Sequence, residues 1–316
     1  MKQKILPLFD LFDDFLLNLQ ANNYSKETLY SYEKDLIVFK NFLGESKINF
    51  SKLTKKDILN YKAYLTSKDR KTANQIKSKK KLTPYSINRM LSSLRSFLKF
   101  LIEMDYPSPL SPDVIKMTKT IKKKSQVAEL ELLTKLIEFP SSFEKNKKVA
   151  IRNRAILEML FATGVRISEL INLKLDKIDK EGKIFILGKG KKERFVYLTP
   201  RAFKHLKKYL TIRHSESPFV FIPYRGANAS DEKNKKISKR YLQAKIKRYR
   251  ELLGINIPTS AHSLRHGFAT YLAESGANPV AIQILLGHES LDTTTRYVHA
   301  SDKYAQKIHK KFHPLK

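Results

Sequence analysis

One short segment constrains how this chain can fold more than any other feature does. Residues 107–124 read PSPLSPDVIKMTKTIKKK, with three prolines followed by a run of lysines. Proline cannot donate a backbone hydrogen bond, and it biases the residue before it toward extended structure, so the segment suits neither a helix nor an internal strand. We therefore predict a basic linker at 107–124, with a first domain at 1–106 and a second at 125–316.

The first domain shows the apolar spacing of packed helices. In residues 25–43, SKETLYSYEKDLIVFKNFL, apolar side chains recur every three or four positions behind Ser25, a suitable helix cap. A second helix is predicted to begin after Thr83, with Pro84 in its first turn. Its apolar stripe consists of Ile87, Leu91, Leu94, Leu98 and Leu101. We predict a helical first domain.

The second domain has a mixed pattern. Residues 148–173, KVAIRNRAILEMLFATGVRISELINL, indicate two helices that meet at Gly164. KIFIL at 183–187 and RFVYL at 194–198 are short apolar runs on either side of a glycine-rich basic turn, which is typical of a hairpin. Helical patterns dominate the rest. The fold class predicted for the whole chain is mainly α with a small β-sheet.

The charge points to a polyanionic partner. Lysine and arginine number 62 against 30 aspartate and glutamate residues, which gives a formal net charge of +32. Such an excess strains a compact fold by self-repulsion unless a polyanion neutralises it, so nucleic acid is the first candidate and a membrane surface the second. The N-terminal MKQKILPLFDLFDDF is too short and too acidic for a signal peptide or membrane span, so we expect a cytoplasmic protein.

Several common kinds of site are excluded. The chain has no cysteine, no GxxxxGK[ST] phosphate loop, no GxSxG nucleophile elbow and no cluster of carboxylates for Mg²⁺. The stretch HSLRH at 262–266 places two histidines four residues apart, as in some zinc sites. It lacks the glutamate of HExxH, and no third ligand is evident. We therefore expect neither a metal nor another cofactor.

Five short stretches carry the polar residues that remain. They are ATGVRISEL (162–170), LGKGKKER (187–194), HSLRH (262–266), LLGH (285–288) and TTTRYVH (293–299). Each is weak evidence alone, since a basic turn or a single histidine is usually structural. Together they suit attack by an oxygen nucleophile on a phosphodiester, whose dianionic transition state needs cationic donors.

The roles follow from the residue types. Arginine is always ionised and binds phosphate oxygens in a fork, so Arg166 and Arg265 could clamp the phosphate. A mobile lysine on a hairpin, Lys189, could protonate the leaving oxygen. Tyr297 could attack and form a covalent ester, because neighbouring cations favour its phenolate. The histidines could hydrogen-bond the phosphate or assist proton transfer.

The order and spacing of these stretches closely resemble the catalytic domain of tyrosine recombinases, most of all those of the Xer type. The resemblance covers about residues 125–300. In the family's order of first arginine, hairpin lysine, HxxR pair, second histidine and nucleophile, the matching positions are Arg166, Lys189, His262, Arg265, His288 and Tyr297. Glu169 matches an acidic residue that supports the site by hydrogen bonding. Relatives commonly carry an apolar residue where this chain has Arg296.

The resemblance implies a two-domain clamp on duplex DNA, with residues 1–106 as a helical, SAM-like core-binding domain. It implies cleavage through a 3′-phosphotyrosyl bond and exchange through a Holliday junction by four protomers, either identical or paired with a second recombinase. It also implies that the C-terminal tail, whose predicted helix carries Tyr304, Ile308 and Phe312, is exchanged between protomers.

Two questions stay open at this level. There is no room before residue 8 for an extra arm-binding domain, which favours a Xer-like dimer resolvase or a recombinase of a simple mobile element. A type IB topoisomerase and a non-catalytic DNA-binding protein are the rivals from other classes. The residues expected to contact the DNA backbone are Lys79, Lys80, Lys81, Lys122, Lys123, Lys124, Lys191, Lys192 and Arg194.

Overall fold

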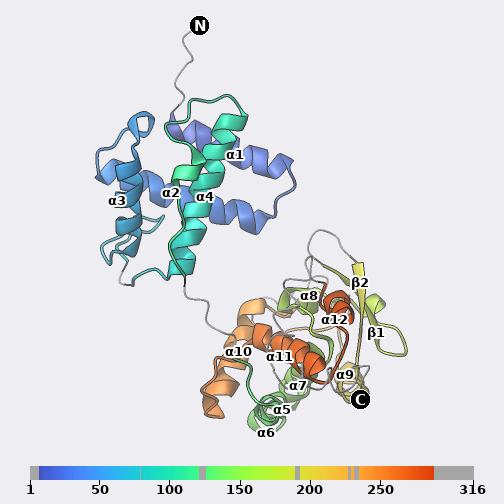
Figure 1. Ribbon diagram of the computed structural model, residues 1–316. Helices are drawn as coiled ribbons and strands as arrows, with labels where there is room; N and C mark the ends of the chain where they lie inside the picture. The colour runs from blue at the N-terminus through green and yellow to red at the C-terminus, as the bar shows by residue number, and fades with distance from the viewer. Residues whose placement is uncertain are drawn as a thin grey trace, which may run out of the picture. The chain divides into compact units, whose positions relative to one another are not determined.

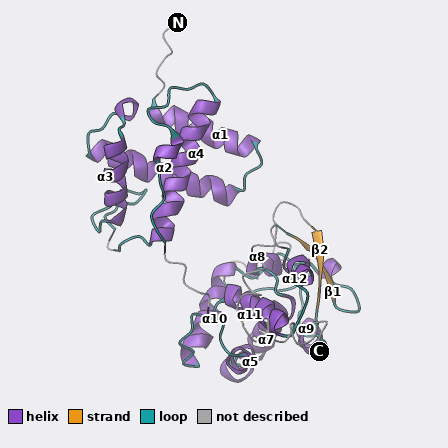
Figure 2. Ribbon diagram, in the orientation of Figure 1, coloured by secondary structure: helices purple, strands orange, loops and turns teal. Residues whose placement is uncertain are grey.

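The chain divides into two compact units, Met1–Lys123 and Lys124–Lys316 (Figure 1). The computed structural model describes residues 7–78, 80–120, 126–188, 193–226, 229–230 and 235–287. Helices make up most of both units, and the two described strands lie in the second (Figure 2). The predicted fold class, mainly α with a small β-sheet, is confirmed. None of the described helices is both long and apolar enough to cross a bilayer.

The first unit is a helical bundle. Its described elements are α1 (Leu8–Ala21), α2 (Lys26–Glu45), η1 (Phe50–Lys52), α3 (Lys55–Thr66), α4 (Pro84–Glu103) and η2 (Pro112–Val114). The helix starts confirm the sequence prediction, because the Ser25 and Thr83 side chains accept backbone hydrogen bonds at 3.2 and 3.3 Å and Pro84 opens α4. The five stripe residues of α4 are all buried in the core of this unit.

Much of the predicted linker packs against α4. Ile115 is 1% exposed and belongs to the core of the first unit. The Thr118 backbone N–H donates to Asn88 Oδ1 at 2.8 Å, and the Asn88 side-chain amide donates back to the Thr118 carbonyl at 3.0 Å. Residues 107–120 therefore pack as part of the first unit, while 121–124 lie outside the described residues. The domain boundaries of the sequence analysis stay a prediction.

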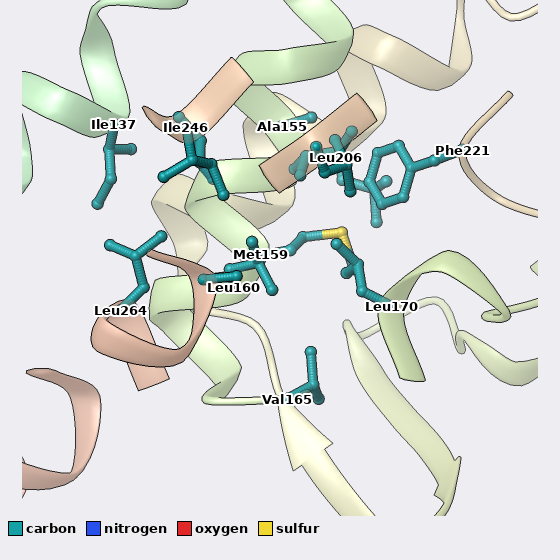
Figure 3. Packing of buried hydrophobic residues seen from close by; sticks show 14 of the residues in the cluster. Ile137, Ala155, Met159, Leu160, Val165, Leu170, Leu206, Phe221, Ile246 and Leu264 are labelled. Atoms are coloured by element: carbon teal, nitrogen blue, oxygen red, sulfur yellow. The ribbon is translucent and has the colours of Figure 1, made fainter. Parts of the chain in front are cut away.

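The second unit is built around one central helix. Its described elements are α5 (Leu130–Glu138), α6 (Pro140–Phe143), α7 (Lys147–Thr163), α8 (Ile167–Ile171), η3 (Leu175–Lys177), β1 (Lys183–Leu187), β2 (Glu193–Tyr197), α9 (Pro200–Leu210), α10 (Lys239–Leu252), α11 (Ala261–Glu274) and α12 (Pro279–Leu286). Met159 and Leu160 of α7 lie among Leu206, Ile246 and Leu264 from three later helices, and all five are at most 2% exposed (Figure 3). Burial of this apolar surface holds α7 in place.

The two strands form an antiparallel hairpin in which Lys183 pairs with Tyr197 and Leu187 with Glu193. Because side chains alternate across a strand, one face of the hairpin is buried and the other is exposed. The buried row of β2 consists of Arg194 and Val196, so an arginine occupies a position of the inner face. The predicted hairpin is confirmed, but its inner face is not entirely apolar.

Gly164 ends α7 and turns the chain into α8. Its φ of 61° is left-handed, a conformation that favours glycine because it carries no Cβ. A Cβ at this position would lie 2.5 Å from Phe268 Cδ1 on α11. The turn therefore needs glycine for both its backbone and its packing, and it sets the position of the α8 N-terminus.

We predict that Gly164→Ala lowers the free energy of unfolding by about 2 kcal/mol or more, from left-handed strain plus overpacking. Gly254→Ala is the matched control, since Gly254 has φ 63° but no atom within 4 Å of a Cβ. Equilibrium urea unfolding of the full chain should show the larger loss for Gly164→Ala. Equal losses would mean that the contact with Phe268 is not limiting.

Candidate active site

Four of the seven residues predicted to be catalytic or supporting lie in the described part of the second unit. Arg166 and Glu169 belong to the start of α8, and His262 and Arg265 to the first two turns of α11. The C-terminus of α12, which packs against both α11 and β2, completes the site (Figure 1). Lys189, His288 and Tyr297 lie outside the described residues.

Arg166 and Glu169 hold each other at the start of α8. Arg166 is the residue just before the helix, and its backbone N–H donates to Glu169 Oε2 at 2.7 Å. Its guanidinium donates to Glu169 Oε1 at 2.9 Å and, more weakly, to the Gly287 carbonyl at 3.4 Å. The Arg166 side chain stays 36% exposed, so a phosphate can reach it from solvent.

Arg265 joins two turns that are distant in sequence. It is 3% exposed, and its guanidinium donates to the Gly164 carbonyl at 2.7 Å and to the Leu286 carbonyl at 2.6 Å. The first carbonyl ends α7 and the second ends α12. Arg265 therefore ties the α7–α8 turn, which contains Arg166, to the end of α12. In sequence, α12 is the helix that precedes His288.

Three arginines meet at the C-terminus of α12. The last carbonyls of a helix lack partners within the helix and carry the negative end of its dipole, so they attract cations. The carbonyls of Leu285, Leu286 and Gly287 accept from Arg194, Arg265 and Arg166, respectively. This helix end thus gathers guanidinium groups from β2, α11 and the start of α8 at one place.

His262 and His266 contact each other on α11. Their Nε2 atoms are 2.8 Å apart, and their rings meet edge to face. Burial and the charges of Arg265 and Arg166 lower the pKa of His262. Burial, with the neighbouring His262 and Arg265, lowers the pKa of His266 to about 4. Both rings are therefore neutral near pH 7, and one Nε2 donates while the other accepts.

No metal cluster is found in the ranges that the structure describes, where no group of three or more histidine, cysteine, aspartate or glutamate residues lies together. The spacing of HSLRH has a different use here. Its two histidines pair with each other, and its arginine turns inward to the carbonyls of two other helices.

Of the residues expected to contact DNA, Lys80 and Lys81 are exposed on the first unit. They follow a loop closed by the antiparallel bridge between Lys71 and Lys77, with Ile76 exposed near its end. Lys79, Lys122, Lys123, Lys124, Lys191 and Lys192 lie outside the described residues. Their contacts with DNA stay a prediction.

The structure corrects the expectation for Arg194. Its side chain is 6% exposed, and its two terminal nitrogens donate to the two oxygens of Glu169 at 3.0 and 2.7 Å. Its Nε donates to the Leu285 carbonyl at 2.9 Å. All three nitrogens of this guanidinium are bonded inside the unit, so none is left for a DNA phosphate in this structure. The reason is the strand alternation, which turns Arg194 inward with Val196.

Glu169 is the anion at the centre of this cluster. Burial alone would raise the pKa of the Glu169 carboxyl, but hydrogen bonds from Arg194 and from the Arg166 backbone and side chain outweigh burial and hold that pKa below its ordinary value. The carboxylate is therefore ionised at neutral pH. The sequence analysis noted Glu169 as a supporting residue but missed its pairing with Arg194 and the role of His266.

Both units match models of known protein domains. Residues 127–304 match the family described as phage integrase family, and residues 12–104 match the phage integrase N-terminal SAM-like domain. Tyrosine recombinase XerC of Leptospira interrogans is 33% identical over 300 residues, which span 92% of this chain and 89% of that protein. Tyrosine recombinase XerD of Listeria innocua is 30% identical over 316 residues, spanning 96% and 99%.

Solved structures share the fold. The XerH site-specific recombinase bound to palindromic difH substrate, in a post-cleavage complex, aligns with a TM-score of 0.71 and 21% identity over 92% of this chain and 80% of that chain. A lambda integrase dimer bound to a COC′ core site aligns with a TM-score of 0.70 and 16% identity, over 91% and 97%.

The histidine pair predicts a pH dependence of stability. Because the pKa of His266 is about 4 in the folded chain and near 6.5 when unfolded, the unfolded state binds more protons between these values. The free energy of unfolding that neutral His266 contributes is fully present above about pH 6.5 and is lost as the pH falls toward 4. We expect the melting temperature of His266→Gln to fall less than that of the wild type over this window.

The exposed His214 provides a matched control, because His214→Gln also removes one histidine from the second unit. This control should keep the wild-type slope of melting temperature against pH. A His266→Gln slope equal to that of the wild type would show that His266 is not held neutral in the folded chain.

Proposed function

This chain belongs to the phage integrase family and is a tyrosine recombinase, and from that premise we propose which residues cut DNA and what task the protein performs. The observation that carries the assignment is the clustering of guanidinium groups at the end of α12, whose last residue, Leu286, lies two residues before His288 and eleven before Tyr297 in sequence. Fixed cations at one point suit a reaction that concentrates negative charge on a phosphate.

In the proposed reaction, the Tyr297 hydroxyl attacks the scissile phosphate. A bond forms between the phenolic oxygen and phosphorus, the bond to the 5′-oxygen breaks, and a 3′-phosphotyrosyl ester and a free 5′-hydroxyl result. The phenol gives up its proton to His262 or His288, and Lys189 supplies one to the leaving 5′-oxygen. Because the ester retains the energy of the broken bond, the reverse attack by a 5′-hydroxyl rejoins the strand without ATP.

The described residues have distinct parts in this proposal. Arg166, exposed on one side and held by Glu169 on the other, donates to a non-bridging phosphate oxygen. Arg265 anchors the base of the site and adds positive charge beneath the phosphate. His262, neutral at pH 7, can act as a hydrogen-bond donor or acceptor to the phosphate, as can His288.

The proposed task is Xer-like resolution of chromosome or plasmid dimers. The named relatives XerC and XerD match over at least 89% of their own lengths, which supports this choice. Four protomers, identical or paired with a second recombinase, would hold two duplex sites, exchange strands through a Holliday junction and share their C-terminal tails. Recombination of a simple mobile element is the alternative task, and it uses the same chemistry at a different DNA site.

We predict that Tyr297→Phe binds duplex DNA with wild-type affinity but forms no covalent adduct, since only the nucleophilic oxygen is removed. The measurement is denaturing electrophoresis of a labelled suicide duplex after incubation with each protein, with Tyr304→Phe as the matched control that keeps the adduct. A persistent adduct in Tyr297→Phe would contradict the assignment. Adducts that form equally on any sequence would favour a type IB topoisomerase.

A further inference from the structure

We propose that Arg194 is a positioning residue that neutralises Glu169, so that the positive charge of Arg166 remains available to the DNA phosphate. This inference rests on the proposed role of Arg166. It assigns to Arg194 a part in the reaction that requires no contact with DNA. The argument depends on how one carboxylate is shared between two guanidinium groups.

Glu169 has two oxygens, and each accepts from both arginines. Oε1 accepts from Arg166 at 2.9 Å and from Arg194 at 3.0 Å, while Oε2 accepts from the Arg166 backbone and from Arg194, each at 2.7 Å. Only Arg194 binds the carboxylate with two side-chain nitrogens. Such bidentate pairs are the stronger and more directional kind, so Arg194 is the principal partner of Glu169.

Burial separates the two arginines further. The side chains of Arg194 and Glu169 are 6% and 7% exposed, whereas that of Arg166 is 36% exposed. A buried charge is costly unless it is paired, so the two buried groups compensate each other. The three groups together carry one net positive charge, and it falls on the arginine that solvent and DNA can reach.

Removing Arg194 would change that balance. Of the guanidinium partners that the described residues give Glu169, Arg166 would then remain, and the two would form a neutral pair. A phosphate approaching Arg166 would have to compete with a buried carboxylate for the same guanidinium. Because the Glu169 carboxylate is buried, this competition is stronger than it would be in bulk solvent. Arg194 prevents it by binding the carboxylate first.

Arg194 is also held from the opposite side. Its Nε donates to the Leu285 carbonyl at 2.9 Å, which ties β2 to the end of α12. Gly287 leaves space for it, because a Cβ there would lie 3.0 Å from Arg194 Cδ in a backbone with φ 63°. The Leu285 carbonyl therefore holds this guanidinium through Nε, and Glu169 holds it through the two terminal nitrogens. These bonds set the position of the Glu169 carboxylate and, through it, that of Arg166.

The first test compares rate with binding for Arg194→Gln in the full chain. Single-turnover cleavage of a suicide duplex should slow by about 10²-fold, the usual cost of a misplaced reacting group. The dissociation constant for the same duplex should rise far less than the cleavage rate falls, because many other basic residues hold the DNA backbone. Equal losses of binding and of cleavage would identify Arg194 as a phosphate contact and overturn the proposal. An unchanged cleavage rate would overturn it too.

The second test is the double variant Arg194→Gln/Glu169→Gln. If Arg194 acts by neutralising Glu169, removing the carboxylate charge as well should release Arg166 and restore about tenfold of the lost rate. A double variant that cleaves no faster than Arg194→Gln would show that the two side chains act independently. If Arg194→Gln slowed cleavage only through lost packing, the double variant would also be no faster, since a further change in the same cluster would not restore the packing.

Controls separate this proposal from folding and from the reaction itself. Arg201→Gln removes another arginine paired with glutamates in the same unit, Glu158 and Glu138, and should cleave at the wild-type rate. If Arg194→Gln does not fold, Arg194→Lys keeps the charge without the bidentate pair and should show a smaller loss of cleavage rate, again larger than its loss of binding. A wild-type chain that forms no adduct would contradict the proposed function, whereas equal adduct formation by wild type and both Arg194 variants would contradict only this inference.

Discussion

The pairing of one buried carboxylate, Glu169, with two arginines is the interaction on which the rest of the site depends. A carboxylate at this depth is stable as an anion only because Arg194 and the backbone and side chain of Arg166 donate to it. The same bonds cap α8, anchor the inner face of the β-hairpin and orient the exposed arginine. One set of hydrogen bonds thus stabilises this part of the fold and also orients the guanidinium of Arg166.

The C-terminus of α12 extends this arrangement to the other motifs. Its last carbonyls, which have no partner within the helix, accept from arginines on three separate elements. The end of the helix therefore holds together segments as far apart in sequence as Arg166 and Leu286. Gly164 and Gly287 make the close approaches possible, since a side chain at either would meet Phe268 or Arg194. Two glycines and three arginines therefore account for how separate stretches of sequence become one site.

Much of the fold could be predicted because its signals are local. Ser25 and Thr83 cap helices whose apolar spacing is visible in the sequence, and the hairpin strands are short apolar runs between turn residues. Arg194 shows where local reading failed. Its basic neighbours suggested a DNA contact, although its spacing of two from Val196 on a strand indicated the inner face. The inward bonds of Arg265 could not be predicted, because their acceptors lie 101 and 21 residues away.

The most direct test of this account is an experimental structure of the chain bound to a duplex suicide substrate. We predict that Arg194 keeps both of its bonds to Glu169 and touches no phosphate, while Arg166 donates at once to Glu169 and to the scissile phosphate. A complex in which Arg194 leaves Glu169 to bind the DNA backbone, or in which Arg166 remains turned away from the phosphate, would contradict the central claim.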